Sequence, residues 1–364
     1  LESVLKRFEA FVALQEHPET YPDPCEHCKF CSWRNICDDR RAADDHLSAV
    51  ANISKSQIRK LQTGGIHRLQ QLAEAGENCR PQGLNAESFA KVQRQARLQQ
   101  EGRTQGTQVY ELLEQQEGRR GFSRLPRPVM GDLFFDMEGN PMEEGGLEYL
   151  FGLYIDEPEG QRFLPFWGHS RSEEKQAFEA FIDFVMAHLQ RYPAAYIYHY
   201  ATYEETAIER LRTQHGTREA QVDSLLRNGK LIDLYKVVRE GVVVSEPSYS
   251  IKYIEHFYMP SRTGDVTNAG ASIVFYEQWK QTGDPSLLEK IERYNEDDVR
   301  STYLLRNWLL EIKPKETSFY TLSNLPEEAV TAQGPTELEQ RLESYRNKLL
   351  ADLPADEKLW DEHA

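Results

Sequence analysis

Three apolar runs with the character of strands follow one another between residues 129 and 168. They are VMGDLFFDME at 129–138, LEYLFGLYI at 147–155 and QRFLPFWG at 161–168. Helical and extended patterns then alternate: a helix at 173–190, a strand at 195–199, a helix from Thr202, a strand at 231–234 and a final helix near 285–310. Three strands followed by this alternation predict an α/β fold, with a mixed β-sheet flanked by helices.

The pattern before residue 129 is helical. Residues 1–24 predict an amphipathic helix, residues 47–75 predict short helices around Gly64-Gly65, and residues 86–100 predict one helix within a segment rich in Gln and Arg. Pro126 and Pro128 close that segment, and residues 313–364 form an acidic tail with helical character near 336–351. We expect four regions, at 1–45, 46–127, 128–312 and 313–364.

Composition and charge set limits on the class of protein. The 364 residues suffice for two or three domains. The formal net charge of -16 argues against nucleic acid, but residues 46–130 hold 13 Lys and Arg against 7 Asp and Glu, so charge leaves the partner open. No membrane-length apolar run and no signal-peptide pattern occur, which favours a cytoplasmic protein without a membrane contact. The chain begins at Leu1, so we expect a fragment of a longer protein.

Four of the five cysteines lie within thirteen residues, at Cys25, Cys28, Cys31 and Cys37. Clustering of this kind, in a chain without a signal peptide, predicts a metal or iron–sulfur site in preference to a disulfide framework. Four thiolates also suit zinc, so both remain open. Cys79 stands apart and is expected to be a plain thiol.

Three acidic clusters carry the candidate chemistry. Asp136 and Glu138 alternate on one strand face, Glu204 follows the fourth strand, and Tyr294 and Asp298 lie four apart on one helical face. Acids gathered from separate elements are what two Mg²⁺ or Mn²⁺ ions need, and a tyrosine hydroxyl can orient an attacking water. Each cluster also has a structural interpretation as a solvated strand end or helix face.

The first turn of the helix after the fourth strand has a structural interpretation of its own. Thr202 and Glu205 have the spacing of a capping box, which would explain Glu205 without a function and leave Glu204 for another role.

The order of these clusters resembles the DnaQ-like 3′–5′ exonuclease superfamily of the RNase H fold, in its DEDDy subgroup. The resemblance implies that Asp136 bridges two ions, Glu138 binds one, Asp298 completes the site and Tyr294 positions the water. The superfamily usually has Asp at the second motif, where this chain has Glu204; Asp233, in LIDLY, is an alternative acid.

The N-terminal motifs resemble those of RecB-like nucleases. Cys28-x2-Cys31-x5-Cys37 is similar to the cysteine triplet of the iron–sulfur members, which implies a [4Fe–4S] cluster with Cys25 as a candidate fourth ligand. Residues 47–75 resemble helix-hairpin-helix modules, which bind phosphate without reading sequence. The whole order resembles RecB-like nucleases with a fused RNase-H-like exonuclease domain, in which a helicase can follow on the same polypeptide.

Several residues outside the acidic clusters are candidates for binding nucleic acid. Basic side chains in the helical segment would attract phosphates, and two tyrosines after the fourth strand could stack on bases; they are Lys55, Arg59, Lys60, Arg68, Tyr200 and Tyr203. Linker and core packing are the structural alternatives.

The sequence therefore predicts a metal-dependent 3′–5′ exonuclease acting on single-stranded ends, with DNA preferred to RNA and a role in repair or mobile-element processing. A non-catalytic nucleic-acid-binding module is one alternative. A ribonuclease or structure-specific endonuclease using the same site is the other.

Overall fold

The structure is a computed structural model that describes residues 2–14, 21–25, 27–28, 31–114, 118–157, 160–260 and 269–321. Residues 1–320 form one compact unit. Among the described residues, no helix is long and apolar enough to cross a membrane. The helix predicted near 336–351 lies outside the described residues.

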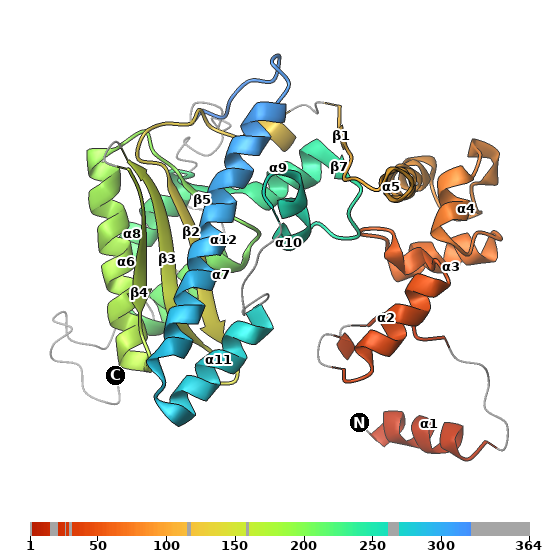
Figure 1. Cartoon of the computed structure of the whole chain (residues 1–364), viewed down its shortest axis with the longest axis horizontal. Helices are drawn as coiled ribbons and strands as arrows, with labels where there is room; N and C mark the ends of the chain where they lie inside the picture. Colours follow the sequence, from red (N-terminus) through yellow and green to blue (C-terminus); the bar gives the residue numbers. More distant parts are fainter. Residues whose placement is uncertain are drawn as a thin grey trace, which may run out of the picture. The chain divides into compact units, whose positions relative to one another are not determined.

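A five-stranded mixed sheet forms the framework of residues 133–312 (Figure 1). The strand order is β4-β3-β2-β5-β6. β3 pairs antiparallel with β2 and β4, whereas β5 runs parallel to both β2 and β6. The strands are β2 (Leu133–Asn140), β3 (Leu147–Glu157), β4 (Gly160–Trp167), β5 (Ile197–His199) and β6 (Leu231–Asp233). The predicted mixed sheet is confirmed.

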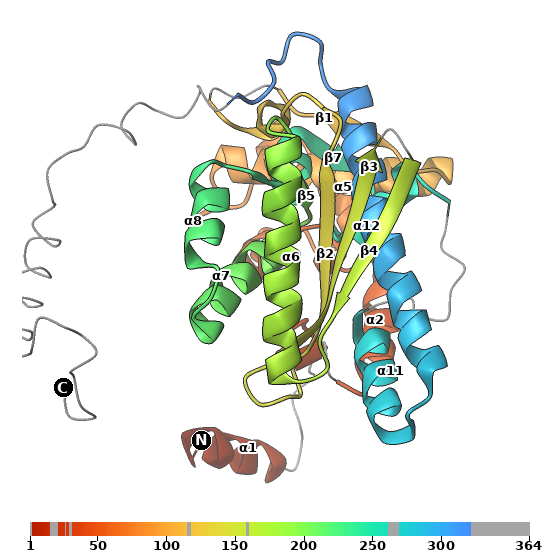
Figure 2. The same ribbon diagram turned by 90° about the vertical axis from the view of Figure 1, so that its left-hand side faces the viewer.

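Helices cover both faces of this sheet, because alternate residues of β2 enter different cores. Leu133, Phe135 and Met137 pack with one set of helices, and Phe134 packs with the other. The first set is α6 (Arg171–Arg191), α7 (Tyr203–His215) and α8 (Glu219–Arg227); the second includes α9 (Leu234–Gly241) and α12 (Pro285–Ile312). Figure 2 shows α6 in front of the sheet.

The N-terminal part of the unit is helical, as predicted. Its helices are α1 (Glu2–Val12), α2 (Arg34–Ala43), α3 (Lys55–Thr63), α4 (Leu69–Glu74) and α5 (Ala86–Gln105). Ser54 and Gln57 form a capping box that starts α3. Gly65 has a φ of 87° in the turn between α3 and α4, a conformation that glycine adopts without steric cost. The predicted turn at Gly64-Gly65 is therefore present.

Main-chain and side-chain contacts join the helical part to the sheet part. β1 (Tyr110–Leu112) pairs antiparallel with β7 (Val242–Val244) in a separate two-stranded sheet. The Gln95 amide of α5 donates to the Val244 carbonyl oxygen over 2.8 Å, and the Gln99 amide donates to the Ala49 carbonyl oxygen over 2.9 Å. These buried glutamines make α5 a packed element in a segment whose composition suggests a linker.

Two helices flank the candidate site and were not among the predicted elements. α10 (Ile251–Ile254) follows β7, and α11 (Ala269–Thr282) packs against α12. Tyr276 of α11 is fully buried on Tyr149 of β3, with 3.9 Å between ring centroids.

Candidate metal site

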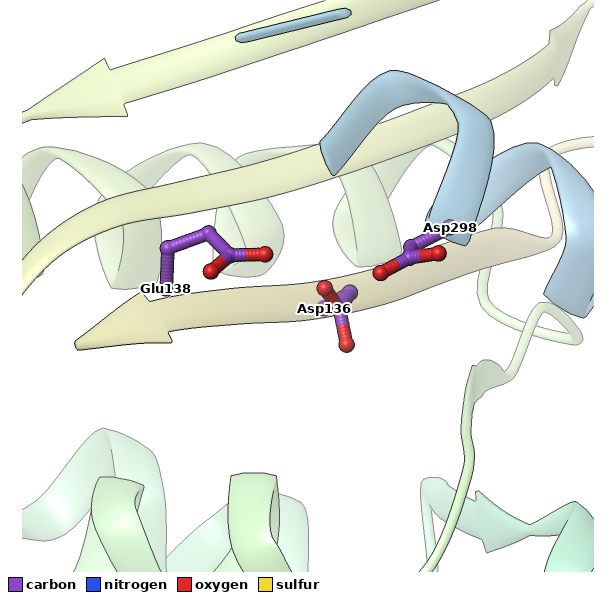
Figure 3. Close-up of side chains that lie close together, drawn as sticks. All are labelled: Asp136, Glu138 and Asp298. Atoms are coloured by element: carbon purple, nitrogen blue, oxygen red, sulfur yellow. The ribbon is translucent and has the colours of Figure 1, made fainter. Parts of the chain in front are cut away.

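Three carboxylates from two elements converge at the middle of the sheet. One ligand oxygen from each of Asp136, Glu138 and Asp298 lies within 4.8 Å of the other two. Figure 3 shows Asp136 and Glu138 on β2 and Asp298 reaching them from α12. These three predicted residues are therefore brought together, although Asp136 and Asp298 are 162 positions apart in the chain.

The local structure of β2 explains how two acids reach the same place. Asp136 and Glu138 are two residues apart, so both side chains leave the same face of the strand. The pairing with β3 shifts register between Glu138 and Gly139, an irregularity that strands often carry beside functional sites. A Cβ atom at Gly139 would lie 2.2 Å from the Glu148 carboxylate, so this position needs glycine.

Burial and the repulsion of neighbouring carboxylates raise the pKa of two of these acids, Asp136 and Glu138. Burial is the main cause that raises the pKa of Asp136 well above its usual value, and the charges of Asp298, Glu204 and Glu138 raise it further. Burial, and then the charge of Asp298, raises the pKa of Glu138 to about 8. Like charges gathered in a poorly hydrated place favour a bound cation.

Lys252 already supplies one positive charge, and sequence reasoning missed it. Its ammonium pairs with Asp298 and lies 4.6 Å from the centroid of the Tyr294 ring. Lys252 lies in α10, a helix of four residues that is too short to show a periodic pattern in the sequence. The lysine therefore places a cation directly beside the carboxylates.

Asn295 is a second residue that the sequence analysis did not identify. Its Nδ2 donates a 2.9 Å hydrogen bond to Oδ2 of Asp136, while its buried Oδ1 has no hydrogen-bond partner. A Cβ atom at Gly152, which pairs with Asp136 across the strands, would lie 1.7 Å from that Oδ1. Gly152 thus makes room for Asn295. Its place three positions before Asp298 puts Asn295 on the same helical face, but its contact with Asp136 depends on the space that Gly152 leaves.

Glu204 lies at the start of α7 and is 4 % exposed. Its Oε2 is buried without a hydrogen-bond partner and lies 3.6 Å from Nδ1 of His199, which is longer than a hydrogen bond. Glu204 is not one of the three acids within 4.8 Å, although its charge acts on Asp136. An orphaned carboxylate oxygen at this place fits a cation that the protein binds from solution.

The capping box expected at the start of α7 is wrong. Thr202 makes no side-chain cap hydrogen bond, and its φ of -97° and ψ of -1° differ from the extended backbone that is typical of a capping residue. Glu205 instead lines a hollow beside Arg119 and Arg124.

Asp233, the alternative acid, holds the backbone. Its Oδ1 accepts hydrogen bonds from the Ala201 amide over 3.0 Å and from the Tyr235 amide over 2.9 Å. The second contact caps α9. Asp233 therefore anchors the loop that leads from β5 to Glu204.

Tyr294 is 5 % exposed and stands one helical turn before Asp298. The tyrosine, the lysine ammonium and the acidic cluster therefore occupy one continuous region. The donor set around it is made of oxygen atoms, which suits hard cations such as Mg²⁺ or Mn²⁺. The residues present fit such ions.

The four clustered cysteines form no disulfide with one another and are exposed or half-buried. Sγ of Cys25 and Sγ of Cys28 are 3.8 Å apart, and the Cys25 amide donates to Sγ of Cys28, which lowers the pKa of that thiol. In the described part of the chain, the cysteines do not bring three potential ligands within 4.8 Å of one another. Their metal ligation stays a prediction, as does the separate role of the exposed Cys79.

The candidate nucleic-acid residues have different surroundings. Lys55, Arg59 and Arg68 are exposed on the helical part, whereas the Lys60 ammonium donates to the Gly83 carbonyl oxygen over 2.7 Å. The identity of α3 and α4 as a helix-hairpin-helix module stays a prediction.

The two predicted tyrosines lie on either side of Ala201 and Thr202. Tyr200 is half-buried and donates to the Tyr249 carbonyl oxygen. Tyr203 is 52 % exposed, and its hydroxyl donates to the Glu148 carboxylate.

Comparison with known proteins gives one result. Residues 133–310 match the family model described as RNase_H superfamily. The match and the mixed sheet agree on an RNase H-like fold, and they indicate a nuclease-type activity on nucleic acid for this part of the chain. Searches of curated proteins and of solved structures found no match.

Proposed function

We propose that residues 133–310 are a metal-dependent 3′–5′ exonuclease that acts on single-stranded ends, with DNA as the preferred substrate. The observation that carries this proposal is the convergence of Asp136, Glu138 and Asp298 within 4.8 Å, inside the region that matches the RNase_H superfamily. The polarity and the assignment to the DEDDy subgroup rest on the resemblance of the acidic motifs and of Tyr294.

Each residue has a proposed task at this site. Asp136, Glu138 and Asp298 hold divalent ions, and Glu204 supplies a fourth carboxylate. Such ions, when bound, activate a water and neutralise the charge that develops on the phosphate. Tyr294 orients that water through its hydroxyl. Asn295 fixes the rotamer of Asp136 through its 2.9 Å hydrogen bond. Lys252 balances the charge of Asp298.

The proposal extends to the N-terminal part. The cysteine quartet would hold a [4Fe–4S] cluster or zinc, α3 and α4 would contact phosphates as a helix-hairpin-helix, and a helicase could belong to the same full-length polypeptide. The exposure of Lys55, Arg59 and Arg68 supports the phosphate contacts.

Digestion of end-labelled oligonucleotides tests the activity. Single-stranded DNA, double-stranded DNA and matched RNA are incubated with Mn²⁺ or Mg²⁺, with the label at either end. A 5′ label should give a ladder of progressively shorter products, and single-stranded DNA should be cut fastest. Asp136→Asn should lower the rate by at least about a hundredfold, because it removes a charge on which the transition state depends at nearly constant volume.

Two further variants test the assignment of the fourth acid. Glu204→Gln should lose activity, whereas Asp233→Asn should mainly lower thermal stability by weakening the anchor of Ala201. Full activity in Glu204→Gln together with a folded but inactive Asp233→Asn would show that the second motif has been misplaced. Binding without cleavage under all conditions would support the non-catalytic module, and internal cuts would support an endonuclease.

A further inference from the structure

A hollow of about 280 Å³ lies beside the acidic cluster and is not part of it. Its lining includes three tyrosines and three small polar residues, namely Tyr200, Tyr235, Tyr249, Asn52, Ser248 and Ser250. Asn52 belongs to the helical part, and the other five belong to the sheet part. The hollow therefore combines aromatic surface with hydrogen-bonding groups, the combination typical of small-ligand sites.

The hollow lies close to the candidate metal site, because two of its lining residues are near residues of that site in the chain. Ala201 lines it and precedes Glu204 by three residues. Ile251 also lines it and directly precedes Lys252, whose ammonium pairs with Asp298. Two segments that line the hollow therefore also carry residues that surround the acidic cluster, namely Glu204 and Lys252.

The tyrosine rings contact one another, and the hydroxyls of Tyr200 and Tyr249 make hydrogen bonds within the protein. Tyr200 donates to the Tyr249 carbonyl oxygen, and the Tyr249 hydroxyl donates to Oε1 of Gln95 over 2.9 Å. The rings of Tyr200 and Tyr235 meet edge to face, with 5.6 Å between centroids. Rings held by such contacts offer aromatic surface to the hollow, which suits a planar aromatic ligand.

An arginine side chain packs against the ring of Tyr249, one of the lining residues. The Arg239 guanidinium lies 4.5 Å from the centroid of the Tyr249 ring. Across the ranges that the structure describes, Arg239 has no ion pair with a carboxylate. An arginine held by an aromatic ring and left without an acidic partner adds a favourable potential for a phosphate-bearing ligand.

The backbone at the hollow is in the left-handed region at two lining residues, which is ordinary for asparagine and strained for alanine. Asn52 has a φ of 61° and Ala201 a φ of 73°. The left-handed region is costly for alanine, so the surroundings must enforce it, and the Asp233 carboxylate does so by accepting from the Ala201 amide. Strain maintained in this way keeps the wall of the hollow in one shape.

We propose that this hollow binds one base of a single-stranded nucleic acid whose end lies at the acidic cluster. This inference rests on the proposed nuclease function. It adds that one base of the substrate binds in the hollow next to the acidic cluster. The tyrosine rings stack on the base, and the Asn52 amide meets its polar edge. A volume of about 280 Å³ is at the small end for ligand sites, which fits a single nucleoside and excludes a base pair with its backbones.

Binding to a 5′-labelled oligothymidylate in EDTA tests the proposal without requiring cleavage. Tyr235→Ala should weaken binding about tenfold, because one stacking surface is lost, while Tyr235→Phe should bind like the wild type. Asn52→Gly should weaken binding by about threefold, since glycine keeps the φ of 61° and removes only the amide. Thermal melting of each variant checks that the fold is intact.

Two probes locate the bound base. An oligonucleotide with a single abasic position, moved stepwise along the strand, should bind about tenfold more weakly at one position only. A single 2-aminopurine should lose fluorescence at that same position, and Tyr235→Ala should restore it. RNA of the same sequence shows whether the hollow distinguishes the two sugars.

Equal affinity of wild type, Tyr235→Ala and all abasic probes would overturn the proposal. Equal loss at every abasic position would also overturn it, because binding would then be spread along the strand. A failure of the proposed function gives a different result. If the enzyme is inactive but an abasic position still weakens binding at one place only, the base site stands and the nuclease function fails. If the enzyme is active but no single abasic position weakens binding, only the base site is refuted.

Discussion

Lys252 shows how single residues manage the charge of the acidic cluster. Asp136, Glu138 and Asp298 repel one another, and the ammonium of Lys252 offsets part of that repulsion through its pair with Asp298. The three acids could be predicted because the spacing of two between Asp136 and Glu138 places both on one strand face, and the spacing of four between Tyr294 and Asp298 places both on one helical face. Lys252 and Asn295 could not be assigned, because their roles depend on tertiary contacts from α10 and across Gly152.

We expect Lys252→Met to destabilise the metal-free protein by about 1–3 kcal/mol, since it leaves the acidic cluster without its counter-charge. In EDTA, the variant should therefore melt below the wild type, and Mn²⁺ should raise its melting temperature more than it raises that of the wild type.

Lys91→Met is the matched control, because Lys91 pairs with Glu87 on an exposed helix face where such pairs contribute little. A Lys252→Met protein that melts with the wild type in EDTA would contradict the role given to this lysine.

At the scale of elements, the long segments with a strong periodic pattern were predicted correctly, whereas short or irregular elements were not. The strands β2, β3 and β4 and the helices α6 and α12 lie where the apolar patterns predict them. α11 was missed because its apolar residues do not keep to one face: Tyr276 is fully buried, while Val274 is 53 % exposed. The helix predicted from Thr202 is present as α7, but the capping box predicted at its start is absent, because the backbone at Thr202 does not adopt the extended conformation of a capping residue.

The cysteine segment, in which Cys25, Cys28 and Cys31 precede α2 and Cys37 lies within it, gives a prediction at the scale of elements. We expect the protein to hold iron or zinc when it is prepared without oxygen, and Cys31→Ser to lose the metal and loosen residues 21–45. Tetrahedral zinc–thiolate sites have Zn–S bonds of about 2.3 Å and hence sulfur–sulfur edges of about 3.8 Å, which is the Cys25–Cys28 distance of 3.8 Å. Visible absorbance and elemental analysis distinguish the metals, and Cys79→Ser serves as the control. A preparation that contains neither metal would refute the prediction.

At the scale of the whole molecule, charge is unevenly distributed. The net charge of -16 hides a basic excess in residues 46–130, and part of the acidity is gathered at the candidate metal site. The sequence predicted this contrast. It did not predict how α5 contacts the sheet part, because buried glutamines such as Gln95 resemble linker residues in composition.

We expect the basic excess to supply a sequence-independent share of binding. Replacing Lys55, Arg59 and Lys60 with alanine should weaken binding to all single-stranded sequences and flatten the salt dependence, by up to about 2 in the slope of log K against log salt. Fluorescence anisotropy across a salt series measures the slope.

The matched control replaces three exposed arginines outside this region, at positions 162, 191 and 227. If the Lys55, Arg59 and Lys60 variant keeps the wild-type slope, residues 46–130 serve only as a structural connection.

The pairing of β1 with β7 has a consequence for the order of folding. Tyr110 and Val244 lie side by side although more than a hundred residues separate them in the chain. Closing so long a loop costs conformational entropy, and three residue pairs offset only part of that cost. Once the sheet between them has formed, the two strands are held closer together and the cost is smaller. We therefore expect the β1–β7 pair to form only after the five-stranded sheet has formed, although β1 precedes that sheet in the chain.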